Sequence, residues 1–400
     1  MAADRPGGDL AGFGIYLHVP FCRNGKCPYC DFYSVTDLAL KPRFLKALVA
    51  EMELISAEKL CFDTLYIGGG TPSVYSHHDI GKIVNAISEN FDLKPESEIT
   101  IEVNPGTVAI EQLRGYRDAG INRINIGVQS FFQGNLDFLG RIHTASEARS
   151  AVTEAQRAGF QNIGLDLIYG LPDQPEGDWL ENLKAAVDYD PTHLSCYTLT
   201  YEKGTPLYSD LNDERIQPLA EAKVRALFEA TIDFLENHGY YQYEISNFAR
   251  IGKNGRPHVS RHNLKYWTLV PYIGLGASAH SFSENQRYWN VSDVADYIAA
   301  IESGRLPEAE REVLSREQQI IETIYLGLRT TAGIDLIGFG QKFGINFVKA
   351  YKEVISDLEE LNYLEVKNNR CALTRQARAF LDSIASMFVV RDVSKVESKN

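Results

Sequence analysis

The amino-acid sequence predicts an α/β protein in which an open or incomplete parallel barrel precedes a smaller C-terminal domain of mixed α and β structure. Between residues 14 and 245, apolar runs typical of strands alternate with amphipathic stretches typical of helices. Polar residues and glycines follow the carboxyl ends of several successive strand candidates, which fits a barrel rim better than a single crevice. The alternation stops near residue 290. We therefore expect two domains, 1–290 and 291–400.

Strand and helix candidates follow one another in order along the chain. The first strand, 14–20, precedes a helix at 41–58, where Pro42 suits the first helical turn. Further strands are expected at 62–69, 99–103, 124–129, 163–169, 193–199 and 241–245. Further helices are expected at 79–90, 110–119, 146–158, 179–189 and 219–237. Beyond residue 290, a winged-helix arrangement is suggested by helices at 318–328 and 347–361, short strands at 363–367 and 370–373, and a last helix at 374–387.

Composition excludes several classes of protein. The 400 residues, 44% hydrophobic and 23% charged, describe a globular chain that can bury a sizeable core. A net charge of −13 disfavours nucleic-acid binding, and residues 311–400, with 13 basic and 12 acidic side chains, offer no basic face. We expect this near-neutral region to pack on the barrel or to cover it. No apolar run is long enough to span a membrane, and residues 1–13 lack a secretory signal, which predicts a cytoplasmic protein.

Three of the six cysteines, Cys22, Cys27 and Cys30, lie together directly after the first strand candidate. Thiolates are soft ligands that favour zinc, Cu(I) or iron–sulfur clusters. A structural zinc site would need a further ligand pair, and none lies nearby in the sequence. Three thiolates on one loop suit a four-iron cluster in which one iron is open to an exogenous ligand.

Two other interpretations of this cysteine group remain open. One is a disulfide with a spare thiol, which the sparse and scattered remaining cysteines do not favour. The other is a metal site completed by a distant protein ligand, for which His18 and His143 are the candidates.

The order of motifs along the chain resembles the radical S-adenosylmethionine superfamily. The segments IYLHVPFC, CPYCDFYS, YIGGGTPS, IEVNPGT, INRINIGVQSF, LGRIHTASEA and GLDLIYGLP resemble its coproporphyrinogen oxidase-like branch. Farther along, YEISNFA, RHNLKYW and YIGLGASAHSF resemble the haem chaperone HemW family, which shares that fold. The resemblance covers nearly the whole chain and implies a partial (β/α)6-type radical SAM barrel with a winged-helix-like C-terminal domain.

The resemblance also implies a cofactor set and the residues that hold it. A [4Fe–4S] cluster would be bound by Cys22, Cys27 and Cys30, with its open iron chelating the methionine moiety of S-adenosylmethionine. The residues implied to surround S-adenosylmethionine are Tyr16, Tyr29, Gly69, Gly70, Thr71, Glu102, Gln129, Arg141 and Asp166. One feature departs from the family: four residues separate the first two cysteines instead of three, and the neighbouring Gly25 could absorb the extra residue as a bulge.

The segment His262-Asn263-Leu264-Lys265-Tyr266-Trp267 matches an HNxxYW element that the resemblance associates with haem. A neutral imidazole can ligate haem iron beside flat aromatic rings, so His262 is the candidate axial ligand. In the alternative interpretation, His262 caps a loop and the two aromatic rings belong to the core. His280 and Cys196 are further candidates for the haem ligand.

The resemblance therefore implies a haem chaperone that binds haem b and delivers it to an acceptor such as a membrane-bound respiratory protein. The alternative is an oxygen-independent coproporphyrinogen III oxidase, and a radical methylase is a third reading of the same cofactor residues. The oxidases carry a further cysteine two positions after the third, where this chain has Phe32, and a longer N-terminal region. Whether the protein catalyses a reaction at all stays open, as does its assembly into a homodimer.

Overall fold

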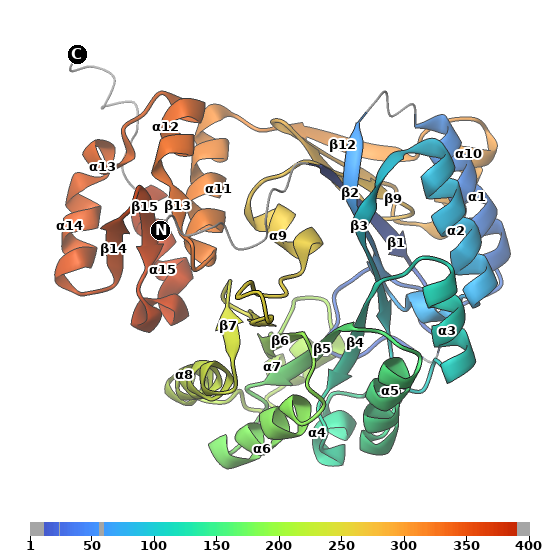
Figure 1. The fold of residues 1–400 in the computed structure, drawn as a ribbon, viewed down its shortest axis with the longest axis horizontal. Helices are drawn as coiled ribbons and strands as arrows, with labels where there is room; N and C mark the ends of the chain where they lie inside the picture. The colour runs from blue at the N-terminus through green and yellow to red at the C-terminus, as the bar shows by residue number, and fades with distance from the viewer. Residues whose placement is uncertain (1–11, 24, 56–59, 390–400) are drawn as a thin grey trace.

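A curved twelve-stranded sheet forms the body of the molecule (Figure 1). The structure is a computed structural model that describes residues 12–23, 25–55 and 60–389. Six neighbouring strands of the sheet are parallel and occur in chain order. They are β1 (Phe13–Val19), β2 (Cys61–Gly69), β3 (Asp92–Val103), β4 (Arg123–Gln129), β5 (Asn162–Tyr169) and β6 (His193–Thr198). All six were expected from the sequence, although β3 begins seven residues earlier than predicted because it pairs with the start of β2.

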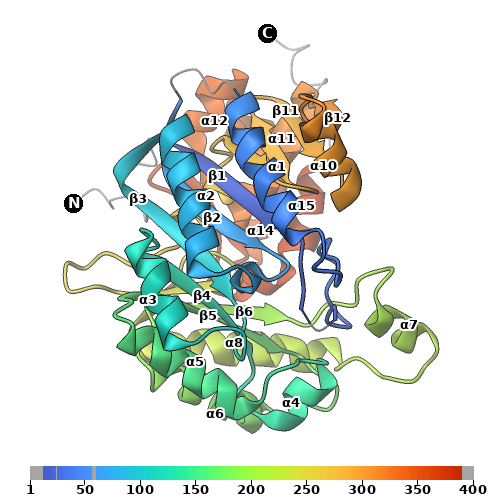
Figure 2. The same cartoon turned by 90° about the vertical axis from the view of Figure 1, so that its right-hand side faces the viewer.

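Helices cover the outer, convex face of the parallel strands (Figures 1 and 2). These are α1 (Lys41–Leu54), α2 (His77–Asn90), α3 (Ile110–Asp118), α5 (Ala145–Arg157), α6 (Glu176–Val187) and α8 (Glu221–Asn237). Shorter elements η1 (Pro72–Val74), α4 (Gln133–Phe138) and α7 (Pro206–Asn212) lie in loops that follow the strands. Residues 56–59, the end of the helix expected at 41–58, lie outside the described residues.

Alternation along the strands separates an apolar outer face from a polar inner face. Residues of one parity, such as Leu17, Ile67 and Ile126, join the helices in one large hydrophobic cluster. Residues of the other parity face the inside of the curved sheet because successive strand side chains point to opposite faces. This inner set comprises Tyr16, His18, Tyr66, Gly68, Thr100, Glu102, Arg123, Asn125, Gly127, Gly164, Asp166, His193 and Ser195.

Both edges of the sheet carry additional strands, and the barrel does not close. On one side β9 (Tyr272–Leu275) runs parallel to β1 and is followed by antiparallel β10 (His280–Ser283), β11 (Gln286–Asn290) and β12 (Glu308–Val313). On the other side β8 (Asn247–Arg250) and β7 (Tyr240–Gln242) are antiparallel. The predicted strand at 241–245 is therefore wrong in extent, since a turn from Tyr243 to Ser246 splits the segment into a hairpin. The open barrel itself is confirmed.

The C-terminal region has its own hydrophobic cluster, which begins at Ile320. It contains α11 (Arg316–Arg329), β13 (Ile334–Asp335), α12 (Leu336–Phe343), α13 (Phe347–Ala350), α14 (Lys352–Glu360), β14 (Leu364–Lys367), β15 (Arg370–Leu373), η2 (Arg375–Phe380) and α15 (Leu381–Val389). The single helix predicted at 347–361 is divided at Tyr351, whose φ of −109° and ψ of 23° are not helical. The last helix begins as a 3-10 turn. Three strands form a small sheet in the order β13-β15-β14, as in a winged-helix arrangement.

The large hydrophobic cluster extends beyond residue 290. Helix α10 (Val294–Glu302) buries Tyr297 and Ile298 in that cluster, beside α1, and β12 belongs to the large sheet. The change from one hydrophobic core to the other therefore falls after Val313. Division of the chain into domains 1–290 and 291–400 stays a prediction.

Candidate functional site

The loop that carries the three cysteines leaves the carboxyl end of β1. Its start is fixed by the Cys22 N–H, which donates to the Val35 carbonyl at 2.9 Å, and its end by the Cys30 N–H, which donates to the Cys27 carbonyl at 3.1 Å. All three thiols are partly exposed and none forms a disulfide. Gly25 has φ of +105° and open space where a side chain would be, which suits a loop with one additional residue.

Three soft thiols on one loop are a donor set suited to an iron–sulfur cluster. Among the described residues, no three His, Cys, Asp or Glu side chains converge as they would on one ion. His18 is bonded on both ring nitrogens, to the Tyr16 hydroxyl and the Tyr33 carbonyl, each at 2.9 Å. Burial is the largest cause that raises the pKa of Cys30 to about 11, and the neighbouring thiols Cys27 and Cys22 add to it. A cationic cluster at this loop would reverse that effect, because positive charge favours the thiolate.

A hydrogen-bond network joins the cysteine loop to the carboxyl ends of β2, β3 and β4. The Thr71 hydroxyl is 3.7 Å from the Cys22 sulfur, and the Asn104 amide donates to that hydroxyl at 2.9 Å. Arg141 donates to the side-chain oxygen Oδ1 of Asn104 at 2.6 Å and to the Cys27 sulfur at 3.3 Å. The guanidinium also lies 3.4 Å from the Tyr29 hydroxyl. Two of the three cysteines are thus bridged through Thr71, Asn104 and Arg141.

The glycines after β2 allow this loop to approach the sheet. A Cβ at Gly69 would lie 2.7 Å from the ring of His18, and one at Gly70 would lie 2.7 Å from the Phe21 carbonyl oxygen. Gly69 also has φ of +107°, a conformation that side chains rarely adopt. Only glycine fits these two positions, and their role in holding S-adenosylmethionine stays a prediction.

The carboxyl groups of Glu102 and Asp166 lie inside the barrel, close enough for the charge of one to affect the pKa of the other. Glu102 accepts hydrogen bonds from the Tyr66 hydroxyl at 2.6 Å and the Gly69 N–H at 3.3 Å. Burial, reinforced by the charge of Asp166, raises the pKa of Glu102 to about 7. Asp166 accepts from the Asn125 amide at 2.6 Å, and its second carboxylate oxygen has no hydrogen-bond partner. Carboxylates with free acceptor capacity at a partly open site can bind the hydroxyl groups of a ligand.

Three inner-facing glycines make room beside these carboxylates. A Cβ at Gly68 would lie 3.1 Å from Glu102, and a Cβ at Gly164 would lie 2.3 Å from the Asn125 side chain. At Gly127, it would lie 3.0 Å from both the Asn104 oxygen and the Gln129 amide. Gln129 itself has φ of +62°, which is uncommon for a residue with a side chain and is found at functional sites. These glycines therefore let the side chains of Glu102, Asn125 and Asn104 lie directly against the strands.

Arg123 is a residue of this interior that the sequence analysis did not single out. Its side chain is 1% exposed, and none of its three guanidinium nitrogens has a hydrogen-bond partner. Its charge lowers the pKa of both Glu102 and Asp166, so it lies within electrostatic reach of the two carboxylates. Its position in the strand could have revealed it. Arg123 is the first residue of β4 and pairs with Thr100 of β3, so its side chain lies on the same inner face.

The HNxxYW element lies at the opposite, amino-terminal end of the barrel. It forms helix α9 (Arg261–Trp267), which sits on the inner side of the sheet (Figure 1). His262 is 0% exposed, and its two ring nitrogens are bonded to the Thr64 hydroxyl at 2.8 Å and the Tyr266 hydroxyl at 2.9 Å. Burial is the main cause that lowers the pKa of His262 to about 3. Ligation of iron by His262 would require one of these hydrogen bonds to break, and that assignment stays a prediction.

Charged contacts fasten α9 at this end. Lys265 is 0% exposed and forms an ion pair with Asp63 at 2.6 Å. Glu98 accepts the backbone N–H groups of Arg261 and His262, each at 3.1 Å, at the start of the helix. The guanidinium of Arg329, from α11, stacks on Trp267 at 4.4 Å and pairs with buried Glu244 at 2.8 Å. The YEISNFA and HNxxYW segments therefore contact the C-terminal region directly.

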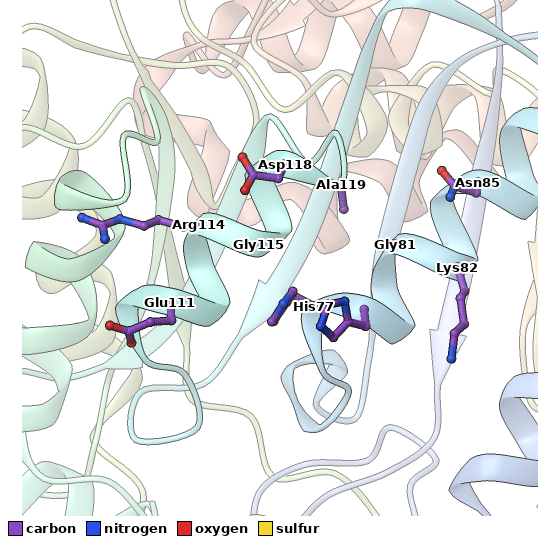
Figure 3. A pocket seen from close by; sticks show the side chains of 10 residues that line it. His77, Gly81, Lys82, Asn85, Glu111, Arg114, Gly115, Asp118 and Ala119 are labelled. Carbon is purple, nitrogen blue, oxygen red and sulfur yellow. The ribbon is translucent and has the colours of Figure 1, made fainter.

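A groove of about 630 Å³ lies elsewhere, between α2 and α3 on the outer face (Figure 3). It is lined by His77, His78, Lys82, Glu111 and Arg114 among others. None of the residues predicted to bind a cofactor lines this groove, so it is separate from the candidate site.

Comparison with known proteins agrees with this geometry. The Radical SAM superfamily model matches residues 16–186, and the HemN C-terminal domain model matches residues 314–380. A Bacillus subtilis (strain 168) protein named Heme chaperone HemW is 33% identical over 94% of this chain and 98% of its own length. The chain belongs to the haem chaperone HemW family. The Haemophilus influenzae member is 31% identical over 96% of this chain and 99% of its own length.

The fold that the HemW family adopts here also matches a solved structure. Coproporphyrinogen III oxidase (HemN) from Escherichia coli, described as a radical SAM enzyme, superposes with a TM-score of 0.80 at 21% identity. The match covers 95% of this chain and 90% of that one. At this identity the likeness shows the fold alone. No helix in the described part of the chain is long and apolar enough to cross a membrane.

Most of the predicted site residues meet at the carboxyl end of this HemW-family barrel. The network and the inner face bring together Cys22, Cys27, Tyr29, Gly69, Thr71, Glu102, Gln129, Arg141 and Asp166. Tyr16 lies deeper, stacked on Tyr66 at 6.3 Å. Asn104 was missed although it links Thr71 to Arg141, and its signal was its position two residues after Glu102 at the end of β3.

Proposed function

We propose that this protein is a haem chaperone that carries a [4Fe–4S] cluster on Cys22, Cys27 and Cys30 and binds S-adenosylmethionine beside it. The observation that carries the cofactor site is the bridge from Cys22 through Thr71, Asn104 and Arg141 to Cys27. The observation that favours a chaperone is membership of a family whose curated members, such as that of Bacillus subtilis, are named for this role.

The bound cluster would supply an electron to S-adenosylmethionine, and the chain's own residues would hold and orient the two groups. Arg141 presents a guanidinium held in place by the Asn104 side chain and the Gly127 carbonyl, and such a group can pair with a carboxylate. Glu102 and Asp166 offer acceptors for hydroxyl groups. The backbone of Gly69, Gly70 and Thr71 brings peptide groups close to the cysteine loop. These interactions position a cofactor whether or not it is cleaved.

The oxidase alternative shares the fold and the cofactor site, so the two functions are separated by what they do to a porphyrin. Phe32, at the position of the oxidases' additional cysteine, is 62% exposed and has no ligand chemistry to offer. A haem-acceptor protein, a homodimer and a cytoplasmic location stay predictions alongside the main proposal.

The deciding experiment is anaerobic reconstitution of the cluster followed by two assays on the same sample. In the first, haem is titrated and followed by absorbance. In the second, the protein is incubated with coproporphyrinogen III, S-adenosylmethionine and a reductant. We expect stoichiometric haem binding and no protoporphyrinogen. Catalytic decarboxylation would instead establish the oxidase and overturn the proposal.

A further inference from the structure

The nine histidines of the chain differ in whether an imidazole nitrogen is available to a ligand. His18 and His262 are bonded on both nitrogens. His143 and His193 are each bonded through Nε2, and their Nδ1 atoms, which have no hydrogen-bond partner, are buried and closed to a ligand. His238 is bonded to the Phe234 carbonyl. The remaining four are His77, His78, His258 and His280, and two of these line the outer groove between α2 and α3.

His280 is the one of these four that lies on the inner side of the sheet. It begins β10, two residues before Phe282, and the two side chains share a face because strand side chains alternate. Phe282 is directly opposite Tyr272, whose ring contacts Tyr266 of the inner helix α9 at 4.7 Å. The charge of His280 also affects the pKa of His18, so it lies within electrostatic reach of the carboxyl half of β1.

The surroundings of His280 suit a large flat ligand. Its ring stacks on Trp289 at 5.4 Å with an angle of 25° between the planes. Gly274, on the neighbouring strand, has no side chain, and a Cβ there would lie 2.1 Å from the His280 carbonyl oxygen. Arg287 shares the face of Trp289 and lies 5.9 Å from the Phe282 ring, which places a cation beside the aromatic side chains.

We propose that His280 is the axial ligand of haem iron, with Trp289 fixing the orientation of its ring on the inner face of the β9–β11 extension. The inference rests on the proposed haem binding and replaces only the ligand, His262. Neutral imidazole is the form that ligates iron, and the partial desolvation of the His280 ring together with the charge of Arg287 lowers its pKa. The aromatic rings would contact the porphyrin. Arg287, which pairs with Glu322 at 2.8 Å, is a cation that could bind a haem propionate.

The test compares His280→Ala with His262→Ala in the full-length protein with its cluster reconstituted, using haemin as the probe. Because His280 is exposed, its substitution should leave the melting temperature unchanged. We expect His280→Ala to weaken haemin binding by about tenfold or more and to shift the Soret band, with added imidazole restoring the spectrum. His258→Ala, which removes another exposed histidine, is the matched control and should bind haemin as the wild type does.

Each outcome separates the ligand from the function. If the wild type binds haemin but His280→Ala keeps its spectrum and affinity, the ligand assignment is overturned and the chaperone proposal survives. Loss of the haem spectrum in His262→Ala, at an unchanged melting temperature, would return the ligand to α9. If the wild type binds no haemin, both proposals fall together.

Discussion

The two ends of the barrel differ in how exposed their charged residues are. At the amino end, His262, Lys265 and Glu98 are buried and each is bonded to a neighbour, although the Trp267 indole N–H and the Arg123 guanidinium have no hydrogen-bond partner. At the carboxyl end, Glu102, Asp166 and Arg141 are partly exposed, and two of them keep a polar atom without a partner. Buried polar groups are ordinarily satisfied. Buried charges bonded to one another are typical of structure, whereas a group of partly exposed charged residues is typical of ligand binding.

This difference bears on motifs that distant relatives share. YIGGGTPS and IEVNPGT lead to the open end, where Thr71, Glu102 and Asn104 face the cysteine loop. HNxxYW leads to the closed end, where its histidine and aromatic rings contact the barrel and the C-terminal region. Motifs that resemble the family equally well therefore lie in two different environments, one around the cysteine loop and the other at a buried helix.

The largest expected effect comes from a substitution at the carboxyl end of the barrel that leaves the amino end unchanged. Cys27→Ala should abolish the cluster, because thiolate is the required ligand and Arg141 then has no sulfur to orient. Iron and acid-labile sulfide measured after reconstitution should fall to background, while the melting temperature of the cluster-free protein stays the same. Cys61→Ala, outside the loop, is the control and should keep full iron content. Normal iron and sulfide in Cys27→Ala would remove the cluster from this loop.

The next largest effect is a loss of stability caused by a substitution at the amino end of the barrel. Lys265→Met leaves the buried Asp63 carboxylate with only the partly exposed Arg261 as its cation, at 3.0 Å. Removing one member of a buried pair costs about 3–5 kcal/mol, and we expect about 3 kcal/mol here because Arg261 compensates. Urea denaturation of the cluster-free protein measures this loss. The double variant Asp63→Asn/Lys265→Met should recover part of it, and a single variant as stable as wild type would show that α9 is not fastened by this pair.

The parts of the molecule that the sequence could predict are those with strong local patterns. Parallel strands such as β4 and β5 are continuous apolar runs bounded by turn residues, so their order and the open barrel were predictable. The extension was not, because β9, β10 and β11 are four or five residues long and carry glycine, serine and aromatic residues without clear alternation. The place of β9 in the sheet depends on its pairing with β1, more than 250 residues earlier in the chain.

The same limit applies to the site. Cysteine and glycine positions follow from local chemistry, and the sequence placed them correctly relative to the strand ends. Arg123 and Asn104 acquire their meaning only from strand register, which shows that one faces inward and the other bridges two loops. One partner of His262 is Tyr266, four residues later in the same helix, but the other is Thr64, 198 residues earlier in the chain. The local pattern could therefore not reveal that both imidazole nitrogens are already bonded.

The pH dependence of stability tests Glu102 at the carboxyl end of the barrel, and its expected effect is smaller than that of Lys265→Met. The folded-state pKa of Glu102 is about 7, above its ordinary value of 4.5. Its contribution to the free energy of unfolding is therefore fully present below pH 4.5 and is lost as the pH rises through 7. The loss should be about 2 kcal/mol, since the carboxylate is partly exposed. Denaturation of the cluster-free Glu102→Gln variant between pH 4.5 and 7.5 should show this part of the dependence removed, and an unaltered slope would contradict the raised pKa.

The smallest effect tests whether the bridge at the open end serves binding more than stability. Asn104→Ala removes the acceptor of Arg141 and the donor to Thr71, but Arg141 keeps the Gly127 carbonyl at 3.1 Å and the Cys27 sulfur. We expect a loss of about 1 kcal/mol in the free energy of unfolding. Affinity for S-adenosylmethionine, measured by equilibrium dialysis on the reconstituted protein, should fall about tenfold, because a displaced guanidinium costs roughly 1.4 kcal/mol of binding. Asn90→Ala, which removes an asparagine bonded only within α2 to the Ala86 carbonyl, should leave that affinity unchanged. A large loss of stability with normal affinity would instead make the carboxyl-end bridge a structural element like α9, and the distinction between the two ends would not hold.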